Sequence, residues 1–292
     1  MLTLLPQLVV GGISTGMLYA LIALSMTVVY RATTVVNFGH GDLVMAGAYA
    51  AFVFTAGLGL PFALALALAM AVLFLLGLFI QRALIEPILT GPHISLAMMA
   101  LAAGNALRGA ARLEWGNQVS AVARPYARMS FLLGNVILTM DDIVISAVVL
   151  LLLAALFVVF HLAPVGKIVQ AMFQTERGAA LVGINVRAFH GVMWGAGAAL
   201  AAVGGALLAL NLTLTPDIGA WTLVRGFAAM TLGGFGSLYG AVVGGLLLGI
   251  MEKVLGFYVS TAFIDISAYV VTIVVLLVRP QGLFGRPAAR RI

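Results

Sequence analysis

Apolar runs of about 20 residues, separated by single charged residues or short polar stretches, recur along nearly the whole chain. A helix of that length spans the hydrocarbon core of a bilayer, and in lipid only helices and closed barrels satisfy their backbone hydrogen bonds. Hydrophobic residues make up 63% of the chain and charged residues only 8%, far below the charged content of soluble domains. The sequence therefore predicts an all-α, polytopic integral membrane helix bundle.

The 292 residues leave room for about eight crossings and for no second soluble domain, so we expect one transmembrane domain over residues 1–292. The first apolar run lacks the preceding basic segment of a cleaved signal peptide, and we expect it to remain as the first crossing. The first expected crossing covers residues 5–30, and the second follows the polar stretch at 37–42 and ends near residue 56. The other six cover residues 61–81, 94–107, 143–162, 188–210, 239–257 and 264–278, and a shorter entering segment lies at 223–232.

The net charge of +6 comes from basic residues scattered over the ends of the apolar runs, with a small C-terminal group at Arg286, Arg290 and Arg291. Such scattering fits topogenic and lipid-facing roles better than binding to nucleic acid. If the polar segment at 166–185 is cytoplasmic, nine of the 15 Lys and Arg residues lie inside and six outside. The positive-inside rule then predicts a cytoplasmic C-terminus and an extracytoplasmic loop at 108–142.

The sequence also excludes several kinds of chemistry. It contains no cysteine, which rules out disulfides, thiol nucleophiles and cysteine-based metal sites. No glycine-rich loop with P-loop spacing ends in Gly-Lys-Ser or Gly-Lys-Thr, so we expect this chain to bind no ATP, and we predict no metal or cofactor on it. A channel would need a repeated filter sequence or a ring of acidic positions, and the sequence has neither.

One motif points to a different class of protein. Gly12 to Gly16 read Gly-Ile-Ser-Thr-Gly, a G-x-S-x-G pattern that, together with His190, would suggest an intramembrane serine protease. A nucleophile elbow needs a strand, a turn and a helix, whereas Ser14 lies in an apolar helical run with no histidine placed to serve it. We therefore interpret Gly12 and Gly16 as a small-xxx-small pair for close helix packing.

The segment at 166–185 is too polar to cross a membrane, yet its apolar residues recur at steps of three and four. Pro164 and Gly166 mark its start and Gly183 its end. We expect one short helix at the membrane boundary, which serves either interfacial packing or the binding of a soluble partner. The expected apolar stripe consists of Ile168, Met172, Thr175, Ala179 and Val182.

Asn37, His40 and Asp42 lie within six positions of one another among glycines, before the second crossing. This composition predicts a broken or re-entrant helix, and the cluster is expected at the cytoplasmic membrane edge. Helix capping by Asn37 and Asp42 and a role in the solute pathway both remain open, with a structural role preferred.

A second glycine-rich stretch, GGFGSLYG at residues 233–240, predicts a break between two helical pieces. Gly233, Gly234 and Gly236 are candidates for this helix break or for the pathway. Gly240 and Gly244 continue the four-residue spacing and predict tight helix packing, with a gate as a possible consequence.

Four stretches together resemble the permeases of ABC importers, and most closely the branched-chain amino acid (LivH-type) family. They are GISTGMLYALIALSMTVVY at 12–30 with NFGHGD at 37–42, the boundary segment GKIVQAMFQTERGAALVGIN at 166–185, LGGFGSLYGAVVGGLLLG at 232–249, and RPQGLFG at 279–285. They occur in the family's order at matching separations, so the resemblance spans nearly the whole chain. The family usually has arginine at the position of Gln170, alanine at Gly39 and glutamate at Asp42.

The resemblance implies a permease subunit that pairs with a second permease chain, expected to be a paralogue, and with two ABC ATPases that carry ATP and magnesium. It also implies an extracytoplasmic solute-binding protein and a bacterial-type inner membrane, and it implies no enzyme activity and no nucleic acid partner. Branched-chain amino acids, urea and short amides remain open as solutes. The residues implied to couple to the ATPase are Gln170, Ala171, Glu176, Arg177, Ala180, Gly183 and Asn185.

Overall fold

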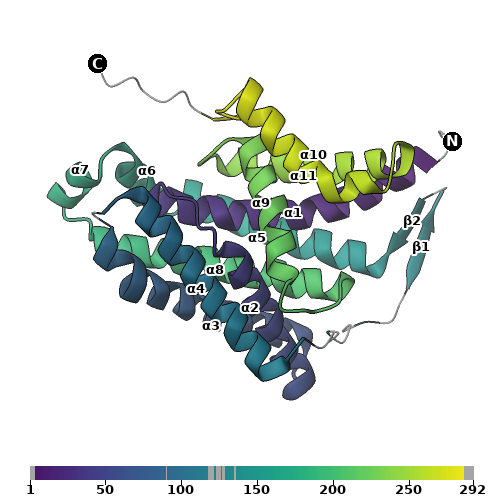
Figure 1. The fold of residues 1–292 in the computed structure, drawn as a ribbon, viewed down its shortest axis with the longest axis horizontal. Coiled ribbons are helices and arrows are strands. Elements are labelled where there is room, and N and C mark those ends of the chain that lie inside the picture. The colour runs from purple at the N-terminus through teal and green to yellow at the C-terminus, as the bar shows by residue number, and fades with distance from the viewer. Residues whose placement is uncertain are drawn as a thin grey trace.

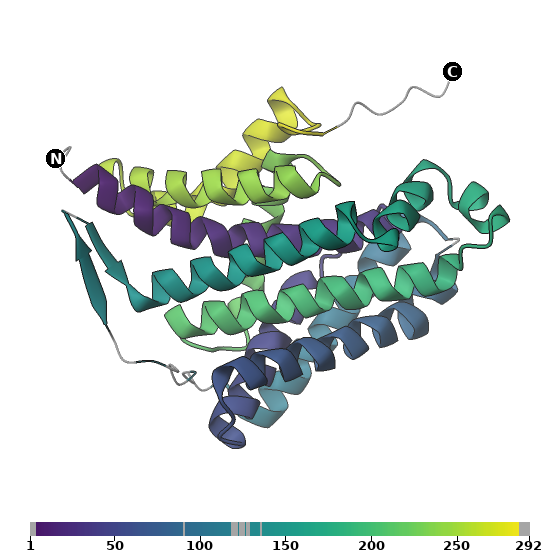
Figure 2. The same cartoon turned by 180° about the vertical axis from the view of Figure 1, so that it is seen from behind.

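The computed structural model describes residues 4–89, 91–117, 122, 126, 129–134 and 136–285. It is elongated, with the short helices α6 (Pro164–Gln174) and α7 (Glu176–Leu181) at one end and strands β1 (Ser130–Leu133) and β2 (Val136–Thr139) at the other (Figures 1 and 2). We call these the α6–α7 end and the hairpin end. Arg286, Arg290 and Arg291 lie outside the described residues, as do Arg124 and Arg128 of the expected loop.

Long helices run between the two ends of the molecule (Figure 2). The helices at His40–Phe52 and Phe62–Ile80 are each followed by a short π-helix, at Val53–Gly57 and Gln81–Ile85 respectively. The second π-helix leads into a 3-10 turn at Glu86–Ile88. The remaining α-helices are α1 (Leu5–Thr33), α2 (His40–Phe52), α3 (Phe62–Ile80), α4 (His93–Trp115), α5 (Met140–His161), α8 (Val186–Asn211), α9 (Ile218–Gly233), α10 (Leu238–Tyr258) and α11 (Ala262–Val278).

The described residues contain six helices long and apolar enough to cross a membrane, namely α1, α3, α4, α5, α8 and α10. The predicted polytopic helix bundle is therefore confirmed. Of the eight expected crossings, the other two correspond to α2 and α11, which have only 13 and 17 residues. A span of about 20 residues is needed to cross the hydrocarbon core alone, so these two elements complete the bundle as shorter pieces.

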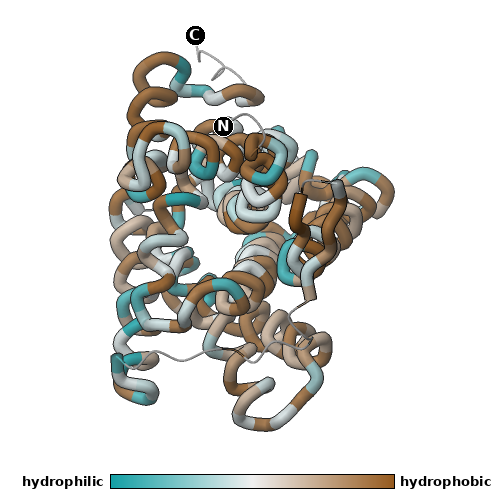
Figure 3. The backbone as a smooth tube through the Cα atoms, turned by 90° about the vertical axis from the view of Figure 1, so that its right-hand side faces the viewer, coloured by the Kyte–Doolittle hydropathy of each residue, from teal (hydrophilic) through white to brown (hydrophobic). Residues whose placement is uncertain are grey.

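The core lies where α1 and α8 pass through the centre of the bundle. Helix α8 packs on α1, α2 and α3, and α1 also packs along α10. Both helices are largely buried, whereas α5 and much of α3 present apolar side chains outward, as lipid-facing helices do. Figure 3, viewed along the long axis from the hairpin end, shows hydrophobic colours over most of the chain.

The expected loop at 108–142 is wrong at both of its ends. Helix α4 continues through Arg108 and Arg112 to Trp115, and α5 begins at Met140. Arg108 pairs with the buried Asp42, whereas Arg112 is about half exposed and pairs with the equally exposed Asp217. Charges that indicate a loop by sequence therefore belong to a packed helix.

The expectation of an all-α chain also needs one correction, because β1 and β2 form an antiparallel hairpin. Its turn contains Gly134 with φ of +63°, a conformation that favours glycine. Gln7 fixes the hairpin to the start of α1: its side chain donates to the Ile137 carbonyl at 3.0 Å and accepts from the Ile137 amide at 2.7 Å. Most of the apolar side chains of the strands are exposed.

Candidate functional site

The boundary segment is broken, and the prediction of one continuous helix is wrong. Thr175 has extended backbone angles (φ −164°, ψ 121°), ends α6 and begins α7. Its hydroxyl accepts a hydrogen bond from the Gly178 amide at 3.3 Å, as an N-capping threonine does. The stripe is divided accordingly: Met172 is buried under α6 and Ala179 under α7, while Val182 is exposed.

The residues implied to couple to an ATPase lie at the α6–α7 end (Figure 1). All but one of these side chains are exposed, the half-buried Ala171 being the exception. Next to them, Leu181 is 89% and Val182 76% exposed. Exposed aliphatic side chains of this kind at the tip of a helix indicate a surface that another molecule covers, and neither was among the residues implied to couple to the ATPase.

One close polar approach, without a hydrogen bond, joins α7 to the buried helix α8. Glu176 Oε1 lies 3.4 Å from His190 Nε2, in the second turn of α8. Asn185 caps α8 by accepting from the Ala188 amide at 3.0 Å. Arg187 then pairs with Glu86, which lies in the 3-10 turn after α3. A displacement of α7 would therefore reach α8, and through it α1, α2 and α3.

The Asn37–His40–Asp42 cluster lies inside the bundle, so its expected position at the membrane edge is wrong. His40 Nε2 is 2.7 Å from the Ser25 hydroxyl, and Ser25 precedes the end of α1 by eight residues. At 1.5 Å of rise per residue, α2 starts about 12 Å inside the end of α1. The chain thus turns back at Thr34 and re-enters the bundle, as the predicted re-entrant element does.

Asp42 is an ion-pair partner and not a helix cap. Helix α2 has Gly39 at its N-cap position without a side-chain cap, and Asn37 orders the turn before it by accepting from the Gly39 amide at 2.9 Å. Asp42 Oδ1 instead accepts from Arg108, 2.7 Å from Nη2 and 2.8 Å from Nε. Asp42 was predicted at the inner membrane edge and Arg108 outside, and the contact overturns that separation.

The contact between α2 and α4 is close at two glycines. A Cβ on Gly39 would overlap the Ala100 carbonyl of α4, so an alanine could not be accommodated here without a shift of the backbone. A Cβ on Gly104 would meet the Asp42 carboxylate, which shows how closely this short acid approaches the α4 backbone. The two glycines and Asp42 therefore belong to one close packing.

The buried contact between His40 and Ser25 does not form a nucleophile site. Ser25 also donates to the Ile22 carbonyl at 2.7 Å, and both side chains are fully buried. Ser14, the serine of the G-x-S-x-G pattern, lies in α1, where the strand-turn-helix elbow of a hydrolase does not exist.

The second glycine stretch forms the turn between α9 and α10 at the α6–α7 end. Gly234 and Gly236 have φ of +105° and +76°, and Gly233 ends α9. The chain after α11 covers this turn: the Leu283 and Phe284 amides donate to the carbonyls of Leu232 and Gly233, each at 2.9 Å. These glycines thus serve a helix break, with the RPQGLFG motif docked against it.

The packing glycines bring backbones into direct contact. A Cβ on Gly12 or Gly16 would lie 2.8 Å from a Cα atom of α10, at Ile250 and Leu246 respectively. A Cβ on Gly240 would overlap the Gly233 carbonyl, and one on Gly244 would lie 2.8 Å from the Gly233 amide nitrogen. Helix α10 is therefore held against α1 on one face and α9 on another.

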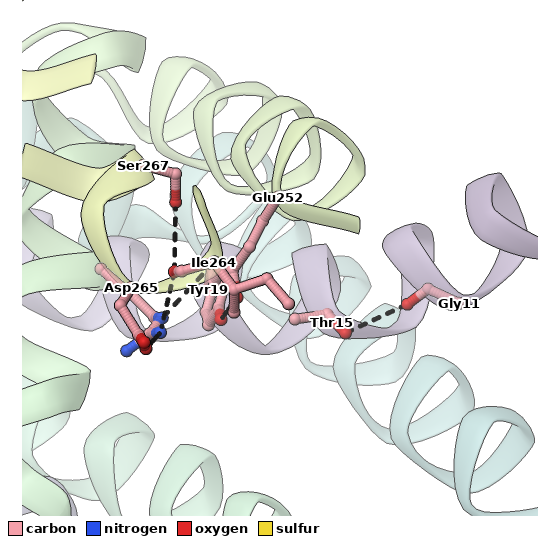
Figure 4. Close-up of polar contacts among 8 residues, drawn as sticks. Gly11, Thr15, Tyr19, Glu252, Ile264, Asp265 and Ser267 are labelled. Carbon is pink, nitrogen blue, oxygen red and sulfur yellow. Dashed lines mark hydrogen bonds and ion pairs between the residues drawn. The ribbon is translucent and has the colours of Figure 1, made fainter. Parts of the chain in front are cut away.

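A polar cavity that the sequence did not predict opens toward the hairpin end. Its volume is about 680 Å³, and it is lined by residues of α1, α5, α8, α9, α10 and α11 and by the loop after α8. At its wall Tyr19 donates to Glu252 Oε1 at 3.1 Å, and Arg225 Nε lies 3.4 Å from Glu252 Oε2. Tyr19, Glu252 and Asp265 approach one another from α1, α10 and α11 (Figure 4). The available signal was an acid and a base within otherwise apolar helices.

The comparisons with known proteins identify the family of the chain. Residues 8–279 match the family described as branched-chain amino acid transport system / permease component. The chain is 30% identical over 300 residues to the high-affinity branched-chain amino acid transport system permease protein LivH of Salmonella typhimurium (strain LT2), covering 98% of this chain and 97% of LivH. It is 31% identical over 305 residues to the corresponding protein BraD of Pseudomonas aeruginosa, with the same coverage of each.

A solved structure supports the fold alone. A chain of PsaBC from Streptococcus pneumoniae in complex with Fab aligns with a TM-score of 0.50 and 13% sequence identity, over 93% of this chain and 91% of that chain. The family match covers more than nine-tenths of the sequence, and it contains the re-entrant element, the boundary segment and all helices except the first three residues of α1. The chain therefore belongs to the branched-chain amino acid transport system permease family.

Proposed function

We propose that this chain is the membrane-spanning permease subunit of an ABC importer that carries branched-chain amino acids across a bacterial inner membrane. The whole-length similarity to LivH and BraD carries this proposal. As a member of this family the chain is a transport subunit and not an enzyme. Its partners in general are an ATPase and a solute-binding protein, so ATP and magnesium belong to the partner chains.

In this proposal the α6–α7 end faces the cytoplasm and α7 docks into the ATPase. Support comes from the exposed tip at Leu181 and Val182, whose aliphatic side chains need a covering partner. The charge bias supports the same orientation, because Arg108 and Arg225 are held in ion pairs inside the bundle. If Arg108 and Arg225 are not counted, four of the Lys and Arg residues predicted outside remain, against nine predicted inside.

The proposed assembly contains two permease chains, the second a paralogue, with two ATPases and an extracytoplasmic binding protein at the hairpin end. ATPase closure would displace α7, and the contact from Glu176 to His190 would pass the movement to α8. Because α8 is packed on three other helices, the movement would tilt a group of helices together. Contacts through glycine and alanine suit such sliding, since no long side chains interlock.

An engineered cysteine tests this docking. The native chain contributes no thiol, so Ala180→Cys gives one reactive group on the exposed face of α7. We expect it to crosslink to the ATPase in the assembled complex, whereas Asn211→Cys, exposed at the hairpin end, should not. Crosslinking from Asn211→Cys alone, or labelling of Ala180→Cys only from outside the cell, would contradict the proposed orientation.

The solute itself is tested by uptake. The permease, its ATPases and its binding protein are reconstituted into proteoliposomes, and the uptake of labelled leucine, isoleucine and valine is measured with and without ATP. We expect ATP-dependent uptake of all three amino acids. Uptake of urea or acetamide in their place would assign the chain to the other solute class.

A further inference from the structure

The cavity at the hairpin end has the size of a ligand site, and no role in coupling or helix packing accounts for it. Its volume of about 680 Å³ falls within the range of small-molecule pockets, roughly 300–1,000 Å³. Its lining combines apolar surface from Leu18, Ile218 and Trp221 with a few polar groups. Such a combination binds a small solute that has both an apolar and a polar part.

The polar part of the wall is a pair of opposite charges held by a loose contact. Glu252 is 4% exposed, yet its closest approach to Arg225 is 3.4 Å. Arg225 has further acceptors within reach: its Nη2 donates to the Ile264 carbonyl at 3.2 Å and lies 4.0 Å from Asp265 Oδ1. The guanidinium also lies 5.8 Å from the centre of the Trp221 ring.

The balance of charge in the cavity limits what it can accept. Its charged lining residues are Asp142, Arg225, Glu252 and Lys253, two of each sign. A solute with a net charge would disturb this balance. A solute carrying one charge of each sign keeps the balance. An uncharged amide or urea would have to compete with Arg225 for Glu252 without offering a charge to either.

From these observations we infer that the cavity is a transient binding site for the zwitterionic head group of an α-amino acid. This assignment rests on the proposed function and names the part of the chain that recognises the solute. The solute carboxylate binds Arg225, and its ammonium group binds Glu252, while the Tyr19 hydroxyl holds the other oxygen of Glu252. Both charges of an α-amino acid lie on groups attached to one carbon, which matches two partner groups that lie side by side.

The aliphatic side chain of the amino acid then lies against Leu18, Ile218 and Trp221. No covalent step is involved. Breaking the contact between Arg225 and Glu252 costs little because it is long, and Asp265 remains beside Arg225 throughout. A site of this kind binds the solute weakly, as a pathway requires if the solute is to leave again.

The inference is tested by protection of a single cysteine in the assembled complex. Thr15 lines the cavity, is partly buried and donates to the carbonyl four residues before it. Thr55 has the same burial class and the same type of bond but lies outside the cavity lining, so it is a matched control. The modification rates of Thr15→Cys and Thr55→Cys by methyl methanethiosulfonate are measured with L-leucine, L-leucinamide or acetamide.

We expect L-leucine to slow modification of Thr15→Cys about tenfold, the factor that about 1.4 kcal/mol of charge-assisted contact provides. L-Leucinamide, which lacks the carboxylate, and acetamide should give no protection, and Thr55→Cys should react at the same rate throughout. Adding Glu252→Gln should abolish protection. If Thr15→Cys does not assemble, Thr213→Cys in the loop that lines the mouth takes its place.

Equal rates with and without L-leucine would overturn the inference, and so would equal protection by L-leucinamide or acetamide. Uptake by the native complex separates this failure from a failure of the proposed function. Leucine uptake without protection rejects the cavity as the site but keeps the importer. Absence of branched-chain amino acid uptake rejects the proposed function itself.

Discussion

Two buried ion pairs join helices of this bundle, and their surroundings differ. Asp42 and Arg108 are 2.7 Å apart, and a Cβ on Gly104 would meet the Asp42 carboxylate, so the contact between α2 and α4 has no space for a ligand. Arg225 and Glu252 are 3.4 Å apart on the wall of a cavity of about 680 Å³. An acid and an arginine therefore hold two helices together where backbone surrounds them. Beside a cavity, an acid and an arginine are placed to bind a solute.

The difference matters because removing one partner of the pair between α2 and α4 leaves a partly or fully buried charge with no cavity beside it to hold a replacement partner. Beside a cavity, water or a solute can replace the missing partner, and the penalty for stability is smaller. The comparison predicts that substitutions in the Asp42–Arg108 pair impair assembly, whereas substitutions in the Arg225–Glu252 pair impair transport. Three sets of substitutions test this difference, beginning with the largest expected effect.

The largest effect is expected for Asp42→Asn. The amide keeps the shape but loses the charge, which leaves the partly buried Arg108 without its partner and should destabilise the chain by about 3 kcal/mol. The measurement is the thermal unfolding and yield of the purified complex. Arg108→Gln should behave alike, and the double substitution should recover much of the loss, because it leaves no unpaired charge. A stable Asp42→Asn complex that cannot transport would instead assign Asp42 to the solute pathway.

A smaller loss is expected when the helices that carry the second pair are pushed apart. In Gly240→Leu or Gly244→Leu the new side chain would meet the α9 backbone, and overpacking of this kind costs about 1–3 kcal/mol. Assembly and leucine uptake should both fall, since α9 carries Arg225 and α10 carries Glu252. Gly109→Leu is the control, because nothing lies within 4 Å of the position that a Cβ would take there and Gly109 does not line the cavity. Equal behaviour of all three variants would place the glycines toward lipid.

The smallest effect on stability is expected for Glu252→Gln. Glutamine keeps the bond from Tyr19 and leaves Arg225 close to Asp265, so the midpoint of unfolding should stay near that of the native complex. Leucine uptake should fall about tenfold, since a charge-assisted contact to the ammonium group is lost. The measurement pairs uptake with the unfolding midpoint on one preparation. A large drop in the unfolding midpoint, with uptake reduced only as much as the amount of folded complex, would instead assign this pair a structural role.

The sequence predicted the parts of the fold that depend on local pattern. Apolar runs give the helices, and glycines at four-residue spacing mark where α10 meets α1 and α9. The break at Gly233 to Gly236 follows from backbone angles that only glycine adopts easily.

The missed features depend on partners far away in the sequence. Arg108 indicated a loop because its partner Asp42 lies 66 positions earlier, and Glu252 pairs with Tyr19 across 233 positions. The depth of His40 likewise follows from its contact with Ser25. The break at Thr175 was missed although threonine is a common helix cap, because the apolar stripe continued through it.

The most direct test of the difference between the two pairs is a structure of the assembled complex trapped with L-leucine. We predict the amino acid in the cavity at the hairpin end, with its carboxylate on Arg225 and its ammonium group on Glu252. These two side chains should then separate beyond roughly 4 Å, the usual limit of an ion pair, while Asp42 and Arg108 stay in contact. Leucine bound elsewhere with the Arg225 and Glu252 contact intact, or separation of Asp42 from Arg108 around the amino acid, would contradict this account.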